Sequence, residues 1–291
     1  MHGVKFVVSS LRFRARPGVA RACALLAALG LLLVAARAQR FRYRDVEEEG
    51  PRPTFPQSGE FHFIRVEYND LPEYRRGFAF ASRNARGQGW WMVDWPDADD
   101  HFSLGVGRLT RVEIGDPRHL SLTDSRLFDY PWIYATQTAW WDLRDDEIAR
   151  LREYLLRGGF LVTDDFWGED WELFRRTMDR LFPNKAITDM PETDAVMHVV
   201  YDIREKDRTF IPGTRHLWIG PGGQVVVRQP LGTMPAWRGM YDERERVMVA
   251  VNYNTDVGDA WEYADSPLYP EAMTTLAYHY GINYLVYAMT H

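Results

Sequence analysis

A strand, a helix and a second strand follow one another in the middle of the chain, and this unit constrains the fold more than any other feature. WIYAT (132–136) and FLVT (160–163) are continuous apolar runs, which is typical of strands buried on both faces of a sheet. DLRDDEIARLREYLL (142–156) lies between them, with its isoleucine and leucines at helical spacing and a glycine pair after it. Such a unit predicts two parallel strands joined by a right-handed crossover.

The rest of the chain repeats this alternation. We expect further strands at 61–70, 110–114 and 246–254, and further helices over 98–109, 171–181 and 270–289. Residues 115–131 are expected to form a loop. The region 185–245 contains a short strand, QVVVRQ, and is interpreted as either an insertion or a hairpin. The alternation predicts an α/β fold with a doubly wound, mostly parallel sheet.

The first 38 residues differ from all that follows. They hold six Lys and Arg residues and no acidic residue, and the apolar run 22–36 leads into the small-x-small triplet Ala36-Arg37-Ala38. This pattern is typical of a secretory signal peptide, and an uncleaved N-terminal membrane anchor is the alternative. We therefore expect an exported protein, periplasmic or anchored to the inner membrane. Residues 39–58 are interpreted as a linker, and residues 59–291 as one α/β domain with an irregular insertion around 185–245.

Cysteine usage and charge exclude several classes of protein. The sole cysteine, Cys23, lies inside the N-terminal segment, so residues 39–291 hold no disulfide, no cysteine nucleophile and no thiolate metal site. The whole chain carries a net charge of −6 although its first 38 residues carry +6, which leaves −12 on the rest. An acidic domain of this kind argues against nucleic acid as a partner, and against membrane contact other than through the N-terminal segment.

Polar side chains gather at the ends of three predicted strands. In parallel sheets, ligands bind beyond the carboxyl ends of the strands, so these side chains are candidates for a ligand site. The candidates are Gln137, Trp140, Asp164, Asp165, Trp167, Asn252, Asn254 and Asp256. Asp164, Asp165 and Asp256 are also candidate ligands for Mg²⁺ or Ca²⁺, both of which prefer oxygen ligands.

The adjacent aspartates Asp164 and Asp165 allow structural and functional interpretations. They could hydrogen-bond neighbouring backbone N–H groups, hold a cation, or act as general acid and base if their environments separate their pKa values. Neighbouring residues of one strand point to opposite faces, so a working pair is expected to join one of them to Asp256 or Asp97. Asp97 and His101 are further candidates at the rim of the cleft, against the alternative of a solvated acidic start to a helix.

Several familiar motifs are missing from the sequence. NYNTDVGDAWEYAD (252–265) places a glycine and a tyrosine where a calcium-binding EF-hand loop needs other residues, and turn chemistry is the favoured interpretation. HExxH, GxSxG, P-loop and GxGxxG motifs do not occur. The pairs Trp90-Trp91 and Trp140-Trp141 are each expected to supply one core residue and one surface residue.

Longer stretches of the sequence resemble a known bacterial family. FDYPWIYATQTAWWDLRDDEIARLREYLLRGGFLVTDDFWG, DWPDADDHFSLGVGRLTRV, IPGTRHL and the closing segment 252–291 are similar to domain of unknown function 4159. The resemblance covers about residues 61–291. It implies a class I glutamine amidotransferase-like fold, which is a flavodoxin-like three-layer α/β sandwich. It does not imply amidotransferase chemistry, because that chemistry needs a cysteine nucleophile.

Two hypotheses of function follow. The first is a ligand-binding or assembly module of the cell envelope, with an envelope protein or a glycan as its partner. The alternative is a carboxylate- or metal-dependent hydrolase that acts on a glycan or another envelope substrate. The sequence leaves open whether the chain is an enzyme.

Overall fold

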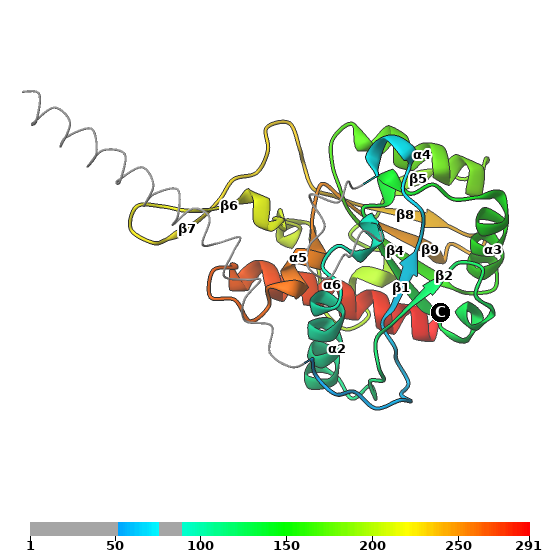
Figure 1. Cartoon of the computed structure of the whole chain (residues 1–291), viewed down its shortest axis with the longest axis horizontal. Coiled ribbons are helices and arrows are strands. Elements are labelled where there is room, and N and C mark those ends of the chain that lie inside the picture. The colour runs from blue at the N-terminus through cyan, green and yellow to red at the C-terminus, as the bar shows by residue number, and fades with distance from the viewer. Residues whose placement is uncertain (1–51, 76–88) are drawn as a thin grey trace, which may run out of the picture. The chain divides into compact units, whose positions relative to one another are not determined.

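The apolar runs of the sequence pair into one mixed sheet in the computed structural model (Figure 1). The structure describes residues 52–75 and 89–291, and within these ranges the sheet has seven strands in the order β2-β1-β3-β4-β9-β8-β5. The first five strands of this order are parallel, and β8 and β5 add antiparallel pairs at one edge. The strands are β1 (Ile64–Glu67), β2 (Arg118–Ser121), β3 (Trp132–Thr136), β4 (Phe160–Phe166), β5 (Ile187–Asp189), β8 (Ala236–Tyr241) and β9 (Val247–Tyr253). The mostly parallel α/β sheet expected from the sequence is confirmed.

Helices cover both faces of this sheet. The helices α2 (Asp97–Leu109), α5 (Val257–Glu262) and α6 (Glu271–Thr290) pack on one face, and α3 (Asp145–Leu156) and α4 (Asp170–Leu181) on the other. Strand β4 shows why, because Phe160 and Val162 belong to the first core cluster and Leu161 to the second. A strand with both faces apolar needs a cover on each side, and the arrangement is compatible with a three-layer α/β fold.

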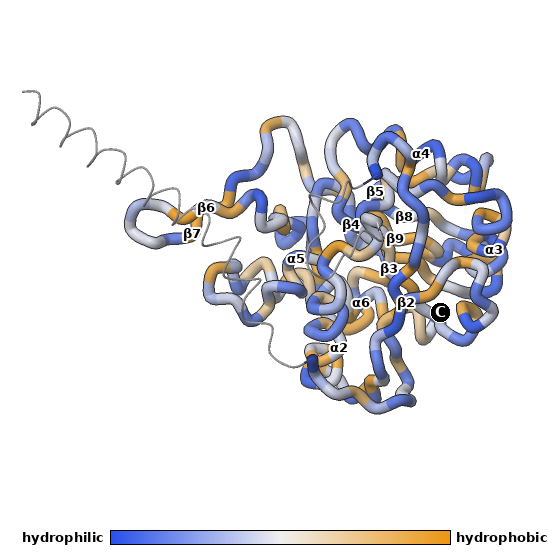
Figure 2. The backbone as a smooth tube through the Cα atoms, in the orientation of Figure 1, coloured by the Kyte–Doolittle hydropathy of each residue, from blue (hydrophilic) through white to orange (hydrophobic). Residues whose placement is uncertain are grey.

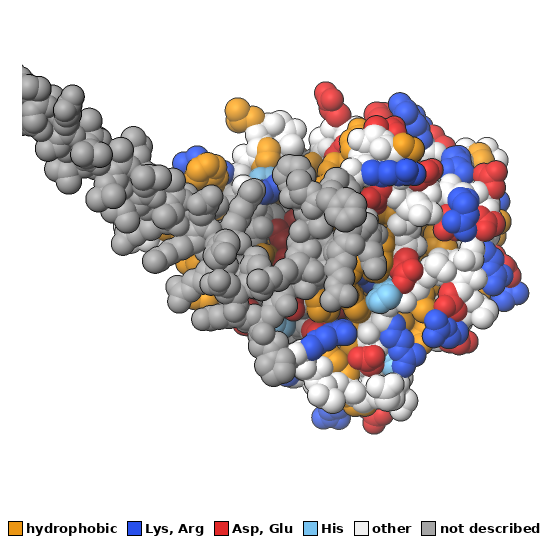
Figure 3. Space-filling view, viewed as in Figure 1, with side chains coloured by type: hydrophobic (Ala, Val, Ile, Leu, Met, Phe, Trp, Pro, Cys, Tyr) orange, Lys and Arg blue, Asp and Glu red, His pale blue; other side chains and the backbone are white. Residues whose placement is uncertain are grey.

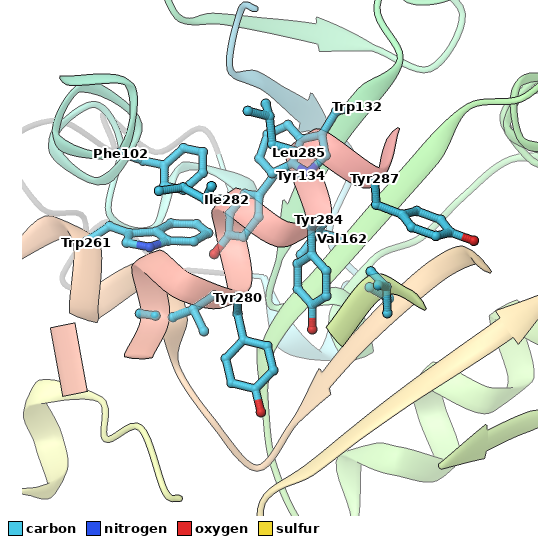
Figure 4. Close-up of a cluster of buried hydrophobic side chains, with 14 of the residues drawn as sticks. Phe102, Trp132, Tyr134, Val162, Trp261, Tyr280, Ile282, Tyr284, Leu285 and Tyr287 are labelled. Atoms are coloured by element: carbon cyan, nitrogen blue, oxygen red, sulfur yellow. The ribbon is translucent and has the colours of Figure 1, made fainter. Parts of the chain in front are cut away.

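The layer between the sheet and α2, α5 and α6 is built largely from aromatic side chains (Figure 4). The ring centroids of Phe102 in α2 and Trp261 in α5 lie 4.4 Å apart, and Trp261 in turn contacts Tyr134 of β3 at 5.6 Å. Figure 2 colours the backbone by hydropathy, and the hydrophobic residues lie on the inner strands while the hydrophilic residues lie on the outer loops. Part of the high aromatic content of the chain thus fills this layer.

One predicted strand is wrong, and one observed strand was expected to be a loop. Residues 110–114 contribute only an isolated bridge between Ile114 and Phe61, whereas β2 lies at 118–121. Strand β2 is at the edge of the sheet, and of its four residues only Leu120 is buried. An edge strand that is covered so little has no run of apolar residues by which it could be recognised.

The region 185–245 contributes to the main sheet through β5 and β8 and also forms a separate two-stranded sheet. This second sheet pairs β6 (Leu217–Ile219) with β7 (Val225–Val227) in antiparallel register. Figures 1 and 2 show it standing away from the main sheet and carrying hydrophobic residues. Of these, Trp218 is 53% exposed and stacks under the guanidinium of Arg228 at 4.5 Å.

Parts of the chain lie outside the described residues. These are the predicted signal peptide at 1–38, residues 39–51 of the predicted linker, and residues 76–88. Residues Pro53–His291 form one compact unit. Among the helices of the described ranges, none is both long enough and apolar enough to cross a membrane.

Charged side chains of both signs are interspersed over the surface formed by α3 and α4 (Figure 3). Arg175 pairs with Asp179 within α4, and Arg180 of α4 lies 2.9 Å from Asp145 of α3. Such exposed ion pairs each stabilise a protein by only about 0–1 kcal/mol.

A buried ion pair on the opposite face has a much larger structural role. Arg65 of β1 and Asp99 of α2 are both fully buried, and the guanidinium binds both carboxylate oxygens. Its second amino group donates to the backbone oxygens of Trp91 and Val93, at 3.1 and 2.8 Å. Arg65 therefore fastens the segment before α2 to the sheet.

We expect Arg65→Met to lower the free energy of unfolding by about 3–5 kcal/mol, because it leaves the buried Asp99 carboxylate without its guanidinium. Urea unfolding followed by circular dichroism measures the change. The double variant Arg65→Met/Asp99→Leu should recover part of the loss, and Arg175→Met on the surface should cost at most about 1 kcal/mol. Equal effects of Arg65→Met and Arg175→Met would contradict this role.

Candidate functional site

Backbone turns of unusual conformation gather where the parallel strands end. Gln137 follows β3, Asp165 is the second-last residue of β4, and Asn254 follows β9, with φ angles of 50°, 52° and 57°. Asp94, in the segment fastened by Arg65, has a φ of 65°. Left-handed backbone of this kind costs a residue other than glycine about 1–2 kcal/mol, and such residues cluster at functional sites.

Asp164 is fully buried and holds the start of α5. Its Oδ2 accepts hydrogen bonds from the Tyr134 hydroxyl at 3.1 Å and from the backbone N–H groups of Val257 and Gly258 at 2.9 Å each. Its Oδ1 is buried without a hydrogen-bond partner. Burial, followed by the negative charge of Asp165, raises the pKa of Asp164 to about 8.

Asp165 points to a different set of partners. Its Oδ1 accepts hydrogen bonds from Trp167 Nε1 at 2.7 Å and Arg215 Nη2 at 2.9 Å, and its Oδ2 accepts one from the side-chain amide of Gln137. Both oxygens are therefore engaged by donors, one of them cationic. Asp165 links the ends of β3 and β4 to the segment that precedes β6.

A cavity of about 300 Å³ lies beside Asp165, and we call it the strand-end pocket. The residues that line it include Gln137, Trp140, Trp167, Asp170, Arg215 and His216. Two contacts fix its walls: Trp140 Nε1 donates to Asp170 Oδ1 at 3.2 Å, and the Arg215 guanidinium lies 4.8 Å from the centre of the Trp167 ring.

The titratable groups of the strand-end pocket are shifted in pKa. Burial, with the nearby charge of Arg215, lowers the pKa of His216 to about 4, so this imidazole is neutral at pH 7. Its Nδ1 is buried without a partner. Partial burial raises the pKa of Asp170. Shifted pKa values in a cavity at strand ends are a typical property of a binding or catalytic site.

A second group of carboxylates lies on the α5 side of Asp164. Asp94, Asp256 and Asp259, which we call the acidic trio, each place one oxygen within 4.8 Å of the others. Burial raises the pKa of each, and repulsion adds to the shift, chiefly from Asp259 at Asp94 and from Asp165 at Asp256 and Asp259. Glu262 lies close enough that the charges of Asp94 and Asp259 add to the effect of burial in raising its pKa.

Asn252 and Asn254 have structural partners. Asn252 is fully buried, and its Oδ1 accepts a hydrogen bond from the Tyr284 hydroxyl at 2.9 Å. Asn254 Oδ1 accepts from the backbone N–H of Gly168 at 2.9 Å, and its Nδ2 donates to the backbone oxygen of Met234 at 2.8 Å. Asn252 therefore fastens β9 to α6, and Asn254 holds the loops at Gly168 and Met234 in place.

His101 and Asp97 lie on α2. His101 Nδ1 lies 3.1 and 2.9 Å from the backbone oxygens of Trp261 and Glu262, so His101 fastens α2 to the end of α5. Asp97 lies in the first turn of α2, and its charge contributes to the raised pKa of Glu262.

The predicted site residues thus fall into separate groups. Gln137, Trp140 and Trp167 line the strand-end pocket with Asp165 beside them, and Asp256 belongs to the acidic trio. Whether any of them binds a ligand remains a prediction.

Sequence reasoning did not place several other residues of the site. Arg215 and His216 lie in the region 185–245 but outside its predicted strand QVVVRQ, and Asp94 lies in a segment without periodicity. The string IPGTRHL, which contains both Arg215 and His216, was the signal that could have indicated them.

Comparison with known proteins bears on this geometry. The sequence model of one protein family, described as a domain of unknown function (DUF4159), matches residues 62–289. The chain belongs to this family. The matched range of the DUF4159 domain contains the strand-end pocket and the acidic trio. Comparison with curated proteins finds no match.

We expect Asp164→Asn to change the pH dependence of stability. The folded pKa of Asp164 is raised above its unfolded value, so the unfolded chain releases a proton between pH 4 and pH 8 that the folded protein keeps. The free energy of unfolding of the unsubstituted protein should therefore fall with rising pH in this window, by about 1 kcal/mol per pH unit relative to the variant.

The asparagine can accept the same three hydrogen bonds through its Oδ1, so the variant is expected to fold. Urea unfolding at pH values from 4.5 to 8.5 with EDTA present measures the difference between the two proteins. A difference that stays constant over this range would show that Asp164 does not carry a raised pKa.

Proposed function

We propose that this DUF4159 protein is an exported ligand-binding domain of the cell envelope, and that its strand-end pocket binds a glycan. The observation that carries the proposal is the lining of the pocket, which combines two tryptophans with an arginine, an aspartate and a neutral histidine. The N-terminal pattern of a basic segment, an apolar run and a small-x-small triplet supports export.

The chemistry of the lining favours a sugar over an apolar ligand. Trp140 and Trp167 offer indole surface to the C–H face of a sugar ring, and both are only partly buried. Arg215 uses Nη2 for Asp165 and is 46% exposed, so its guanidinium can donate to hydroxyl or carboxylate oxygens. The Asp170 carboxylate can accept hydrogen bonds from the hydroxyl groups of a sugar. A cavity of about 300 Å³ is at the small end of ligand sites, which suits a single sugar unit.

Binding explains the pocket better than hydrolysis does. A glycosidase needs two carboxyl groups that flank the bond to be cleaved. Asp170 is one carboxyl group of the strand-end pocket, and the neighbouring Asp165 has both oxygens engaged by Trp167, Arg215 and Gln137. These contacts orient the Asp165 carboxylate towards the walls of the pocket, which favours a structural role for it in ligand binding.

We further propose that the fold is the flavodoxin-like sandwich of class I glutamine amidotransferase-like proteins. The order of the parallel strands, β2-β1-β3-β4-β9, supports this because it follows the 2-1-3-4-5 order of flavodoxin-like sheets. In such sheets, the carboxyl ends of the strands form the binding edge, and the strand-end pocket lies there.

We expect Trp167→Phe and Trp140→Phe each to weaken glycan binding by about threefold to tenfold, because each removes indole surface from the pocket. An array of soluble glycans that includes peptidoglycan fragments and N-acetylglucosamine oligomers identifies the ligand, and isothermal titration calorimetry measures its affinity.

Trp218→Phe is the matched control, since Trp218 also stacks under an arginine but lies on the β6–β7 sheet. Its affinity should equal that of the unsubstituted protein. Binding of no glycan, or binding that only Trp218→Phe weakens, would contradict the proposal.

A further inference from the structure

We propose that the acidic trio of Asp94, Asp256 and Asp259 binds a divalent cation, with Ca²⁺ as the ion that fits best. The site is separate from the lining of the strand-end pocket, and the proposal does not depend on glycan binding. It rests on how three segments converge, on buried oxygens that have no partner, and on the charge of the surroundings.

Each member of the trio is held in place by a defined contact. The backbone oxygen of Asp94 accepts the N–H of Ala98 at 2.9 Å, at the start of α2. Asp256 caps α5, with its Oδ1 accepting the N–H of Asp259 at 2.9 Å. Asp259 Oδ2 accepts hydrogen bonds from the backbone N–H and the hydroxyl of Thr214. Contacts of this kind fix the first ligands of a metal before the metal arrives.

Two carboxylate oxygens, one in the trio and one in the neighbouring Asp164, are buried without a hydrogen-bond partner. Asp94 Oδ2 and Asp164 Oδ1 are both buried and have no hydrogen-bond partner, and the whole Asp164 residue is buried. An unsatisfied buried oxygen costs about 1–3 kcal/mol, and more when it is charged. Asp164 Oδ2 accepts hydrogen bonds from the backbone N–H groups of Val257 and Gly258, which directly follow Asp256 in the chain. Asp164 therefore lies next to the trio.

Two glycines keep the space around these oxygens open. A Cβ on Gly258 would lie 2.5 Å from Asp94 Oδ2, and a Cβ on Gly213 would lie 2.5 Å from Asp256 Oδ2 and 3.1 Å from Asp259 Oδ2. Neither glycine has a positive φ, so neither is required by the backbone conformation. The close approach to the carboxylates is therefore the reason for a glycine at both positions.

The charge around the trio is unbalanced. Asp164, Asp165 and Glu262 lie close enough to act electrostatically on the trio or to be acted on by it. Of the nearby cations, Arg65 pairs with Asp99 and Arg215 with Asp165, and their charges act on the trio as well, Arg65 on Asp94 and Arg215 on Asp256 and Asp259. Within the described ranges, no Lys, Arg or His forms an ion pair with Asp94, Asp256 or Asp259, so three neighbouring carboxyl groups have no close counter-ion. A divalent cation supplies the missing positive charge.

The kind of ligand atom determines which metal ions suit the trio. The trio offers oxygen atoms alone, which suits Ca²⁺, Mg²⁺ and Mn²⁺ and not the softer metals that prefer nitrogen and sulfur. Two oxygens that bind one Ca²⁺ at about 2.3–2.6 Å can lie up to about 5 Å apart, and one oxygen of each member of the trio lies within 4.8 Å of the others. Mg²⁺ demands a near-ideal octahedron and usually keeps several waters, so a buried set of protein carboxylates suits it less well than Ca²⁺.

The test is direct binding of Ca²⁺, Mg²⁺ and Mn²⁺ to the full chain after treatment with EDTA, measured by calorimetry at pH 7.5. We expect one Ca²⁺ per chain, bound more tightly than Mg²⁺. Asp256→Asn and Asp94→Asn should each weaken Ca²⁺ binding by more than the ~10–100-fold that loss of an outer-shell partner causes. Asn can still cap α5, so Asp256→Asn is expected to fold.

Asp189→Asn is the matched control, because Asp189 is an exposed carboxylate on the edge strand β5. Its affinity for Ca²⁺ should be unchanged. Circular dichroism establishes that each variant is folded before it is compared. The proposal is overturned if the folded protein binds none of the three ions up to 10 mM (roughly the weakest range of protein calcium sites), or if the Asp94 and Asp256 variants bind Ca²⁺ as the control does.

Discussion

The buried contact between Arg65 and Asp99 is the interaction on which the arrangement of the site depends. Arg65 lies on β1, next to the edge strand β2, and its side chain is fully buried. The same guanidinium that binds Asp99 also donates to the backbone oxygens of Trp91 and Val93. Asp94 is the next residue after Val93. The ion pair thus determines where Asp94 lies relative to Asp256 and Asp259, and α2 is fixed to β1 by the same contact.

A second series of contacts connects the aromatic layer to the site. Tyr134 packs against Trp261 in the core, and its hydroxyl donates to Asp164. Asp164 in turn holds the first residues of α5, whose cap is Asp256. Asp165, one residue further along β4, has φ > 0 and binds Arg215 in the strand-end pocket. The two adjacent aspartates therefore serve two neighbouring sites: Asp164 holds the start of α5, and Asp165 binds the donors Trp167, Arg215 and Gln137.

Some of this could be predicted from the sequence because local patterns determine it. The βαβ unit followed from two apolar runs and one helical stripe, and of the tryptophan pairs Trp91 and Trp141 are buried while Trp90 and Trp140 are partly exposed. Edge strand β2 was missed because its side chains are largely uncovered.

The site was predicted only in part because its contacts join distant segments. Asp165 and Arg215 are 50 residues apart, and Asp94 meets Asp256 through the fold alone. The strand ends indicated Asp164, Asp165 and Asp256 because parallel strands bring their carboxyl ends to one edge. No periodicity could indicate Asp94, Arg215 or His216, since they lie in irregular segments that the sheet brings together.

Anomalous X-ray diffraction from crystals of the full chain grown with Ca²⁺ tests the central claim most directly, which is that this edge of the sheet holds a cation. We predict one anomalous peak at about 2.3–2.6 Å from carboxylate oxygens of Asp94, Asp256 and Asp259. The absence of a peak there, with the three carboxyl groups sharing protons in hydrogen bonds to one another, would contradict it.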